Sequence, residues 1–288
     1  MMPQLPDTSP PLTLIFGVFD PTGAEGLPAD AVTCAALGSH ALGVLTGTAI
    51  ADSSGSQHIN PIIADQIDEQ ARTLLEDMQI SAFKVGGVFS PEAASILAQI
   101  IADYSDAPMV LHLGESYNAS EASGDPDEED IMVGATLELL VPQAHTVVID
   151  EARLPYWFND DVIEHLDGAT GPNGLLTLGA DWALVLNHSQ RPGYLVNLLL
   201  GPDGQTHSFA AWVRPARSQD VSGLVATALA AGLAKGLSPV QASENACAYA
   251  AQSLKNAFQA GMGARMARRF MPPVPIMPAA QTDLAPKS

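Results

Sequence analysis

The run GAEG at residues 23–26 is the first segment of the chain whose residue types could do chemistry. Backbone N–H groups in such a turn can cradle a phosphate, but the Glu25 carboxylate would repel one. The sequence also lacks the more specific pattern G-x-x-x-x-G-K-[ST]. Asp30, in the alanine-rich run that follows, is explained as a carboxylate that stabilises the N-terminal end of a helix. The turn by itself is therefore weak evidence for a phosphate site.

Histidines and cysteines, the residues of most metal and nucleophilic sites, are scattered along the chain. His112, His145 and His188 each stand at one end of an apolar run, and no two have the spacing of metal ligands. We expect them to be core or rim residues rather than ligands. Cys34 and Cys247 lie far apart in helical runs, so neither a disulfide nor a zinc site is expected. These residues predict a reduced protein without a metal centre.

Two polar groups near the C-terminal end have structural explanations. Ser218 and Asp220 precede an apolar helical run and are typical N-cap residues. Arg265, Arg268 and Arg269 follow the last helical run. These arginines could form a small anion site, but a basic helix C-terminus that complements the helix dipole explains them equally and is the interpretation that we favour.

Composition and charge exclude several classes of protein. The chain has 288 residues, of which 47% are apolar and 15% charged, which excludes a disordered chain. No apolar run is long enough to span a bilayer. The formal net charge of −20, with no Lys or Arg in residues 1–71, makes nucleic acids and anionic membranes poor partners. The N-terminus lacks the basic and apolar regions of a signal peptide, so we expect a cytoplasmic protein.

The elements that must position these residues alternate between apolar, strand-like runs and helical runs. Near-continuous apolar strands separated by helices predict a parallel sheet that is covered on both faces. The expected strands are 12–18, 41–50, 80–86, 108–113 and 145–149, and the expected helices are 27–37, 61–78, 91–102 and 130–140. The fold class is therefore α/β.

The pattern changes after Trp182. Strand-like runs follow one another without helices at 183–186, 194–200 and 206–211, and the turn GPDG separates the last two, which predicts an antiparallel hairpin at one edge of the sheet. Two alanine-rich helices are expected at 221–235 and 239–257. Residues 1–11 and the proline-rich residues 271–288 are predicted to be tails, and 12–270 a single domain.

Several motifs give the chain a resemblance to a known family. Residues 17–30 (GVFDPTGAEGLPAD), 34–38 (CAALG) and 44–47 (VLTG) resemble the opening of the hydroxymethylpyrimidine and phosphomethylpyrimidine kinases of thiamine biosynthesis. That family begins with a strand, a turn of the form D-P-S-G-G-A-G-I-Q-A-D, a helix that ends in A-L-G, and a strand V-I-T-A. Residues 84–86 (KVG) and 123–126 (SGDP) are similar to its K-I-G and S-G-D-P. The resemblance covers nearly all of the expected domain.

The resemblance implies a ribokinase-like fold, a three-layer α/β/α sandwich. It also implies transfer of the γ-phosphoryl group of ATP, with Mg²⁺, to a hydroxymethyl group on a small heterocycle, the pyrimidine precursor of thiamine. Members are usually homodimers. The implied substrate-binding residues lie at the carboxyl ends of the N-terminal strands and are Asp20, Asp30, Thr46, Gly86 and Val88.

The family's phosphoryl-binding signature, G-T-G-C or G-x-G-D, is altered. Alignment places Asp220, Val221, Ser222 and Gly223 at these four positions, so the last three take the place of the anion hole and Gly223 cannot act as the base. A slip of one helical turn would bring the Asp220 carboxylate to the position of the base. The alternative is that Asp220 is an N-cap, which we favour because Val221 and Ser222 replace glycines that let phosphate approach.

Other motifs of the family are altered as well. T-P-N-x-x-E, K-G-G-H and D-P-V-M appear as residues 148–153 (VIDEAR), 186–189 (LNHS) and 112–115 (HLGE), and the Gln that reads the aminopyrimidine falls on Ala51. These changes predict weak ATP binding. Two alternatives stay open: an active kinase with rearranged catalytic residues, and a catalytically degenerate homologue that binds a small molecule or a partner. Stabilisation by nucleotide distinguishes them.

Overall fold

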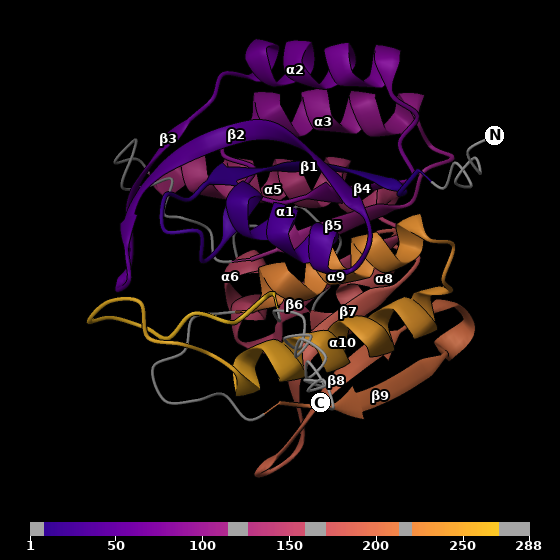
Figure 1. Cartoon of the computed structure of the whole chain (residues 1–288). Helices are drawn as coiled ribbons and strands as arrows, with labels where there is room; N and C mark the ends of the chain where they lie inside the picture. Colours follow the sequence, from indigo (N-terminus) through magenta and orange to yellow (C-terminus); the bar gives the residue numbers. More distant parts are fainter. Residues whose placement is uncertain (1–8, 115–125, 159–170, 213–220, 271–288) are drawn as a thin grey trace, which may run out of the picture.

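The computed structural model describes residues 9–114, 126–158, 171–212 and 221–270, and its strands form one sheet (Figure 1). Their order is β3-β2-β1-β4-β5-β6-β7-β8-β9. The strands are β1 (Leu12–Phe19), β2 (His40–Asp52), β3 (Gly55–Pro61), β4 (Ala82–Val85), β5 (Met109–Leu113), β6 (Thr146–Asp150), β7 (Ala183–Arg191), β8 (Tyr194–Leu200) and β9 (Thr206–Ala210). The predicted domain limits stay predictions, because residues 1–8 and 271–288 lie outside the described ranges.

Strands β2, β1, β4, β5, β6 and β7 run parallel. Every residue of β4 is buried, as expected where helices cover both faces of a parallel sheet. Strands β8 and β9 extend the sheet antiparallel at one edge, and β3 does so at the other. The mostly parallel sheet with an antiparallel edge hairpin is therefore confirmed, and β3 adds an antiparallel strand that the sequence analysis did not predict.

Helices cover both faces of the sheet. Helices α1, α9 and α10 pack together on one face (Figure 1), and α2, α3 and α5 form a contiguous layer on the other. The helices are α1 (Gly26–Ala36), α2 (Ala64–Asp77), α3 (Pro91–Asp103), α5 (Pro126–Leu139), α6 (Leu154–Trp157), α8 (Gly171–Thr177), α9 (Ser222–Ala234) and α10 (Pro239–Lys255). The two largest apolar clusters lie on opposite faces of the sheet, so the three-layer arrangement is confirmed. None of the helices in the described ranges is both long and apolar enough for a membrane span.

Two expected helices begin elsewhere. The helix expected from residue 61 begins at Ala64, because residues 55–61 form β3. Ile59 is the one buried residue of β3, so the strand carries almost no apolar pattern that could reveal it. Pro61 stands at the end of this edge strand, where its missing N–H does no harm. The helix expected from residue 130 begins at Pro126.

Helix α9 is the central element of its layer. Eleven of its 13 residues are buried, and it contacts strands β1, β4, β5 and β6 as well as α1 and α10. A helix that is apolar all round belongs in the interior of a protein. Its first residue, Ser222, contacts His112 near the end of β5, so the N-terminus of α9 lies at the carboxyl ends of the parallel strands. Ligands of α/β proteins bind at that edge of the sheet.

Candidate active site

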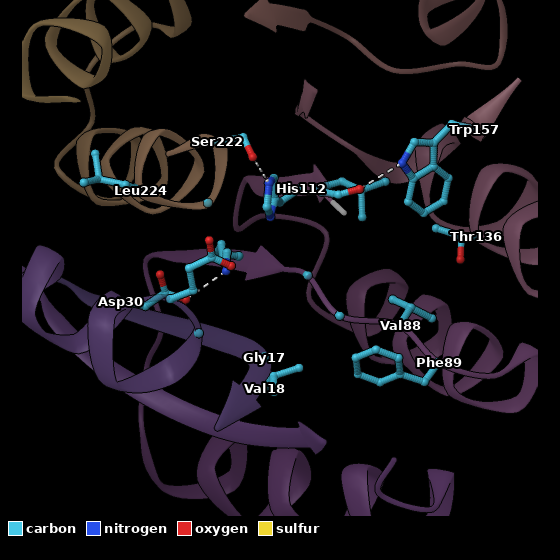
Figure 2. A pocket seen from close by; sticks show the side chains of 18 of the residues that line it. Gly17, Val18, Asp30, Val88, Phe89, His112, Thr136, Trp157, Ser222 and Leu224 are labelled. Carbon is cyan, nitrogen blue, oxygen red and sulfur yellow. Dashed lines mark hydrogen bonds and ion pairs between the residues drawn. The ribbon is translucent and has the colours of Figure 1, made fainter. Parts of the chain in front are cut away.

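A cavity of about 80 Å³ lies where β1, β4 and β5 end, facing the start of α9 (Figure 2). A water needs about 10–15 Å³ of such space, so the cavity has room for about six waters, or for a small ring. Its wall combines apolar side chains with a few charged groups, which is the usual character of a small-molecule site. The apolar part comes from Val18, Val88, Phe89, Leu111, Met132 and Trp157.

A buried ion pair forms part of the cavity wall. Lys84 Nζ lies 2.8 Å from Asp30 Oδ2, and both side chains are at most 5% exposed. Thr227 Oγ1 donates a hydrogen bond of 2.6 Å to Asp30 Oδ1. These contacts join β4, α1 and α9, and they engage both carboxylate oxygens of Asp30. Asp30 thus lines the cavity and fixes the Lys84 ammonium there, while its role in substrate binding stays a prediction.

The other implied substrate-binding residues divide into two groups. Gly86 and Val88 line the cavity, whereas Asp20 and Thr46 do not. The Asp20 carboxylate accepts hydrogen bonds from the backbone and hydroxyl of Thr22 and from the backbone N–H of Glu25, so it shapes the turn before α1. Thr46 is buried where the pairing of β1 with β2 shifts register, and its hydroxyl has no partner among the described residues.

The start of α9 provides hydrogen-bond donors at the cavity. Val221 is the N-cap residue, is buried and has no side-chain acceptor, while Ser222 and Gly223 line the cavity wall. The first N–H groups of a helix lack partners within the helix and attract anions. Of the three residues implied as an anion hole, Ser222 and Gly223 therefore line the cavity at a helix N-terminus, whereas Val221 does not line it, and their role as an anion hole stays a prediction. Asp220, the candidate base, lies outside the described residues.

His112 is a cavity residue that the sequence did not predict. His112 Nε2 lies 2.8 Å from Ser222 Oγ, and the ring lines the cavity instead of the rim of the sheet. The other two histidines pair with carboxylates: His145 Nδ1 lies 3.2 Å from Asp181 and His188 Nδ1 lies 2.6 Å from Glu151. No local signal separates His112 from these two, because its partner is 110 residues away.

Arg269 is a second missed residue. Helix α10 ends at Lys255, so the arginine does not complement that helix's dipole but lies buried at the cavity. Its guanidinium donates hydrogen bonds of 3.0 Å to Thr33 Oγ1 and 2.7 Å to the carbonyl of Ala24. Burial lowers the pKa of this guanidinium from its ordinary value, although an arginine stays charged. The C-terminal segment thereby closes the cavity next to α1.

A second, larger hollow of about 610 Å³ opens at the ends of β6 and β7. Asn187 Nδ2 donates a hydrogen bond of 2.6 Å to Asp150 in its wall, and the buried Trp212 Nε1 has no partner among the described residues. Of the described residues that line it, none is Lys or Arg. The described residues also contain no cluster of three or more His, Cys, Asp or Glu that could hold a metal ion.

Comparisons with known protein sequences agree on one family. Residues 20–268 match the family model described as phosphomethylpyrimidine kinase. A Streptomyces coelicolor hydroxymethylpyrimidine/phosphomethylpyrimidine kinase is 29% identical over 270 residues, which cover 91% of this chain and 96% of that protein. A protein of the same name from Mycobacterium bovis is 26% identical, covering 90% and 93% of the two chains.

Solved structures share the fold. A Bacillus subtilis pyridoxal kinase, solved as an ADP complex, has a TM-score of 0.74 at 18% identity and covers 91% of this chain and 98% of its own. A phosphomethylpyrimidine kinase from Clostridium difficile has a TM-score of 0.64 at 20% identity, covering 84% and 97%. These likenesses confirm the ribokinase-like arrangement of the described sheet and helices.

Proposed function

Because the chain belongs to the phosphomethylpyrimidine kinase family, we propose that it transfers the γ-phosphoryl group of ATP to a hydroxymethyl group on a small nitrogen heterocycle. The thiamine-precursor pyrimidine is the acceptor that the relatives' names support. Their names support the kinase over the alternative of a degenerate binding module. Loss of several catalytic motif residues is then a rearrangement of the site within an active enzyme.

The observation that carries the proposal is the cavity itself, where the Lys84 ammonium and the N-terminus of α9 meet. Ser222 and Gly223 at the helix start and Lys84 on β4 all line it. Phosphoryl transfer needs positive potential around the transferring group and the attacking oxygen, and a helix N-terminus and an ammonium both supply it. Phe89 and Trp157 give the same cavity an aromatic wall suited to a flat ring.

ATP supplies the phosphoryl group, and we place its nucleoside part in the hollow beside Asp150 and Trp212. Trp212 Nε1, which has no partner among the described residues, is a buried donor that a ligand acceptor would satisfy. Mg²⁺ binds mainly through substrate phosphates and one or two carboxylates, so the described residues need no dedicated metal cluster. Asp150 is the carboxylate in the wall of this hollow.

A phosphoryl-transfer assay tests the proposal. Purified protein is incubated with ATP and Mg²⁺ and, in turn, with hydroxymethylpyrimidine, its phosphate and pyridoxal, and the phosphorylated product is measured by chromatography. We expect product with a pyrimidine acceptor. Ligand-dependent stabilisation by the heterocycle without any turnover would instead support the degenerate binding module, and turnover with pyridoxal alone would contradict the proposed acceptor.

The resemblance also leads us to propose that the chain is a cytoplasmic homodimer. Apolar side chains are exposed on the β2 side of the sheet, among them Phe19, Ile50 and Val32. Such side chains could pack against a second copy of the chain. Sedimentation velocity separates the 30.0 kDa monomer from a dimer of twice that mass. A species of 30.0 kDa at micromolar concentration would contradict the proposed dimer.

A further inference from the structure

The His112 side chain occupies a space that three glycines leave open. A Cβ atom at Gly114 would lie 2.6 Å from His112 Cε1, and one at Gly223 would lie 3.4 Å from the same atom. A Cβ at Gly86 would lie 3.5 Å from His112 Nδ1. Any larger residue at Gly114 would push the ring away. The imidazole therefore has a built pocket at the end of β5, and Figure 2 shows it beside Ser222 within the cavity.

The space above Gly86 is where two polar groups converge. The three heavy atoms nearest to a Cβ placed at Gly86 are Lys84 Nζ at 3.4 Å, His112 Nδ1 at 3.5 Å and His112 Cβ at 3.6 Å. Because Gly86 has no side chain, this residue places no atom between the two nitrogens. A hydroxyl oxygen bound in the cavity between the two nitrogens would have an ammonium donor on one side and an imidazole nitrogen on the other. This is the geometry required of a group that loses a proton while it attacks phosphorus.

The remaining charged groups of the cavity are less suited to taking a proton. Asp30 already accepts hydrogen bonds from Lys84 and Thr227 on both oxygens. Lys84 and Arg269 are cations, and neither accepts a proton in its charged form. The Glu25 carboxylate belongs to the N-cap residue of α1 and is not among the atoms that converge above Gly86. An imidazole titrates near neutral pH, which suits a general base.

We propose that His112 is the general base of this kinase, a role that rests on the proposed function. With Nε2–H donating to Ser222 Oγ, Nδ1 accepts the proton as the O–H bond of the substrate hydroxymethyl group breaks. The hydroxyl oxygen bonds to the γ-phosphorus of ATP while the bond from that phosphorus to the bridging oxygen breaks and releases ADP. Lys84 Nζ stabilises the developing negative charge on the attacking oxygen. The imidazolium then returns its proton to water.

The position of Gly223 supports this assignment. Gly223 aligns with the base of the resembling family, and its missing side chain leaves the room that the His112 ring fills. The base has thus moved from the start of α9 to the end of β5 while it serves the same cavity. Ser222, one residue earlier on the helix, holds the ring and is a positioning residue.

Variants of His112 test the inference against a matched histidine. His112→Asn keeps a side-chain donor for Ser222, and His112→Ala opens space for added imidazole. We expect kcat to fall about 100-fold or more in both, with little change in KM for ATP, and imidazole to restore part of the activity of His112→Ala. His145→Asn, just before the amino end of β6 and beside Asp181, should keep wild-type kcat. Circular dichroism and melting midpoints confirm that each variant is folded.

A pH profile separates a base from a structural residue. Wild-type kcat/KM should fall on the acid side of neutrality, and this acid limb should vanish in His112→Asn. Among the described residues, the charged groups that share the cavity with the ring are Glu25, Asp30, Lys84 and Arg269. Folded His112 variants with more than a tenth of wild-type kcat would overturn the inference and leave the kinase standing. So would loss of turnover in Asp220→Asn alone. A wild type without transfer to any acceptor would overturn the proposed function as well.

Discussion

At the scale of single residues, the stability of the site depends on the buried ion pair between Lys84 and Asp30. Removing one member of a buried ion pair leaves an uncompensated charge and costs about 3–5 kcal/mol. We expect Lys84→Met to lower the free energy of unfolding by about that amount, because the buried Asp30 carboxylate, 1% exposed in the wild type, then keeps only the Thr227 hydroxyl as a side-chain hydrogen-bond donor among the described residues. Urea unfolding followed by circular dichroism measures the loss.

Two further variants test whether the loss of stability comes from the unpaired Asp30 charge. Thr227→Val removes one hydrogen bond to the same carboxylate and should cost less, about 1–3 kcal/mol. Removing both charges, with Lys84→Met and Asp30→Asn together, should recover part of the loss. A single Lys84→Met that costs under about 1 kcal/mol would contradict a desolvated pair.

The two cysteines predict how stability depends on alkaline pH. Burial raises the pKa of the Cys34 and Cys247 thiols from an ordinary 9.0 to about 12. The native state therefore holds these protons more tightly than the unfolded chain, so stability is full below about pH 9 and falls as pH rises from there toward 12. Urea midpoints of the double Cys→Ala variant should decline less steeply over this range. A part of the decline should remain, because burial also raises the pKa of Tyr249.

The same thiols should resist modification in the native protein. Thiolates react with disulfide reagents and thiols do not. An aromatic disulfide reagent at pH 8 should therefore modify neither of the buried thiols of Cys34 and Cys247 until urea unfolds the chain. Stoichiometric reaction of the folded protein within minutes would show that at least one thiol is exposed.

Cavity residues that belong to a short sequence motif could be predicted from the sequence. Cavity residues that are held there by contacts with distant parts of the chain could not. Asp30, Gly86 and Val88 were placed by short motifs tied to strand ends. His112 and Arg269 reach the cavity through contacts with Ser222 and Thr33, which lie 110 and 236 residues away, and no local pattern encodes such contacts. Asp20 illustrates the opposite difficulty, because a carboxylate that folds its own turn looks in sequence like one that binds a ligand.

At the scale of elements, the C-terminal segment after α10 closes the cavity. It returns to the turn between β2 and β3, where Gly263 N donates a hydrogen bond of 3.0 Å to Ser53 Oγ, before Arg269 contacts Thr33 of α1. A Cβ at Gly263 would lie 2.1 Å from the carbonyl oxygen of Ser53. We expect Gly263→Ala to shift the segment, to cost about 1–3 kcal/mol and to weaken heterocycle binding, as measured by urea unfolding and calorimetry.

Gly134→Ala provides the matched control. Gly134 lies inside α5, and a Cβ there would meet no described atom within 4 Å. Alanine should stabilise the helix by about 0.5–1 kcal/mol and leave heterocycle binding unchanged. Equal binding by the Gly263→Ala and Gly134→Ala proteins would show that the segment does not shape the cavity.

The regular elements could be predicted where the apolar pattern is strong. The helix expected at 27–37 is observed at Gly26–Ala36, and the strand expected at 108–113 at Met109–Leu113. Strand β3 escaped prediction because it lies at an edge with almost all of its side chains exposed, so only pairing with β2 makes it a strand. Tertiary contacts decide such segments, and local periodicity does not.

At the scale of the whole molecule, the net charge of −20 makes stability dependent on salt. Like charges repel in the compact state, and salt screens them, with a Debye length that falls from about 30 Å at 0.01 M to about 8 Å at 0.15 M. The exposed pairs of Arg72 with Asp68 and Asp103 lose little on screening. The melting midpoint in scanning calorimetry should therefore rise over this range, and a fall would show that exposed ion pairs outweigh the repulsion.

The shift of the melting midpoint by each ligand tests heterocycle binding and ATP binding separately. A heterocycle at 100 times its Kd adds about 2.7 kcal/mol, a shift of several degrees for a chain of this size. ATP with Mg²⁺ at millimolar concentration should shift the midpoint much less, because Leu186 stands where the resembling family has Lys and the described wall of the hollow has no basic residue. The Streptomyces coelicolor relative, melted in parallel, is the reference. An equal ATP shift in both proteins would mean that other groups hold the triphosphate.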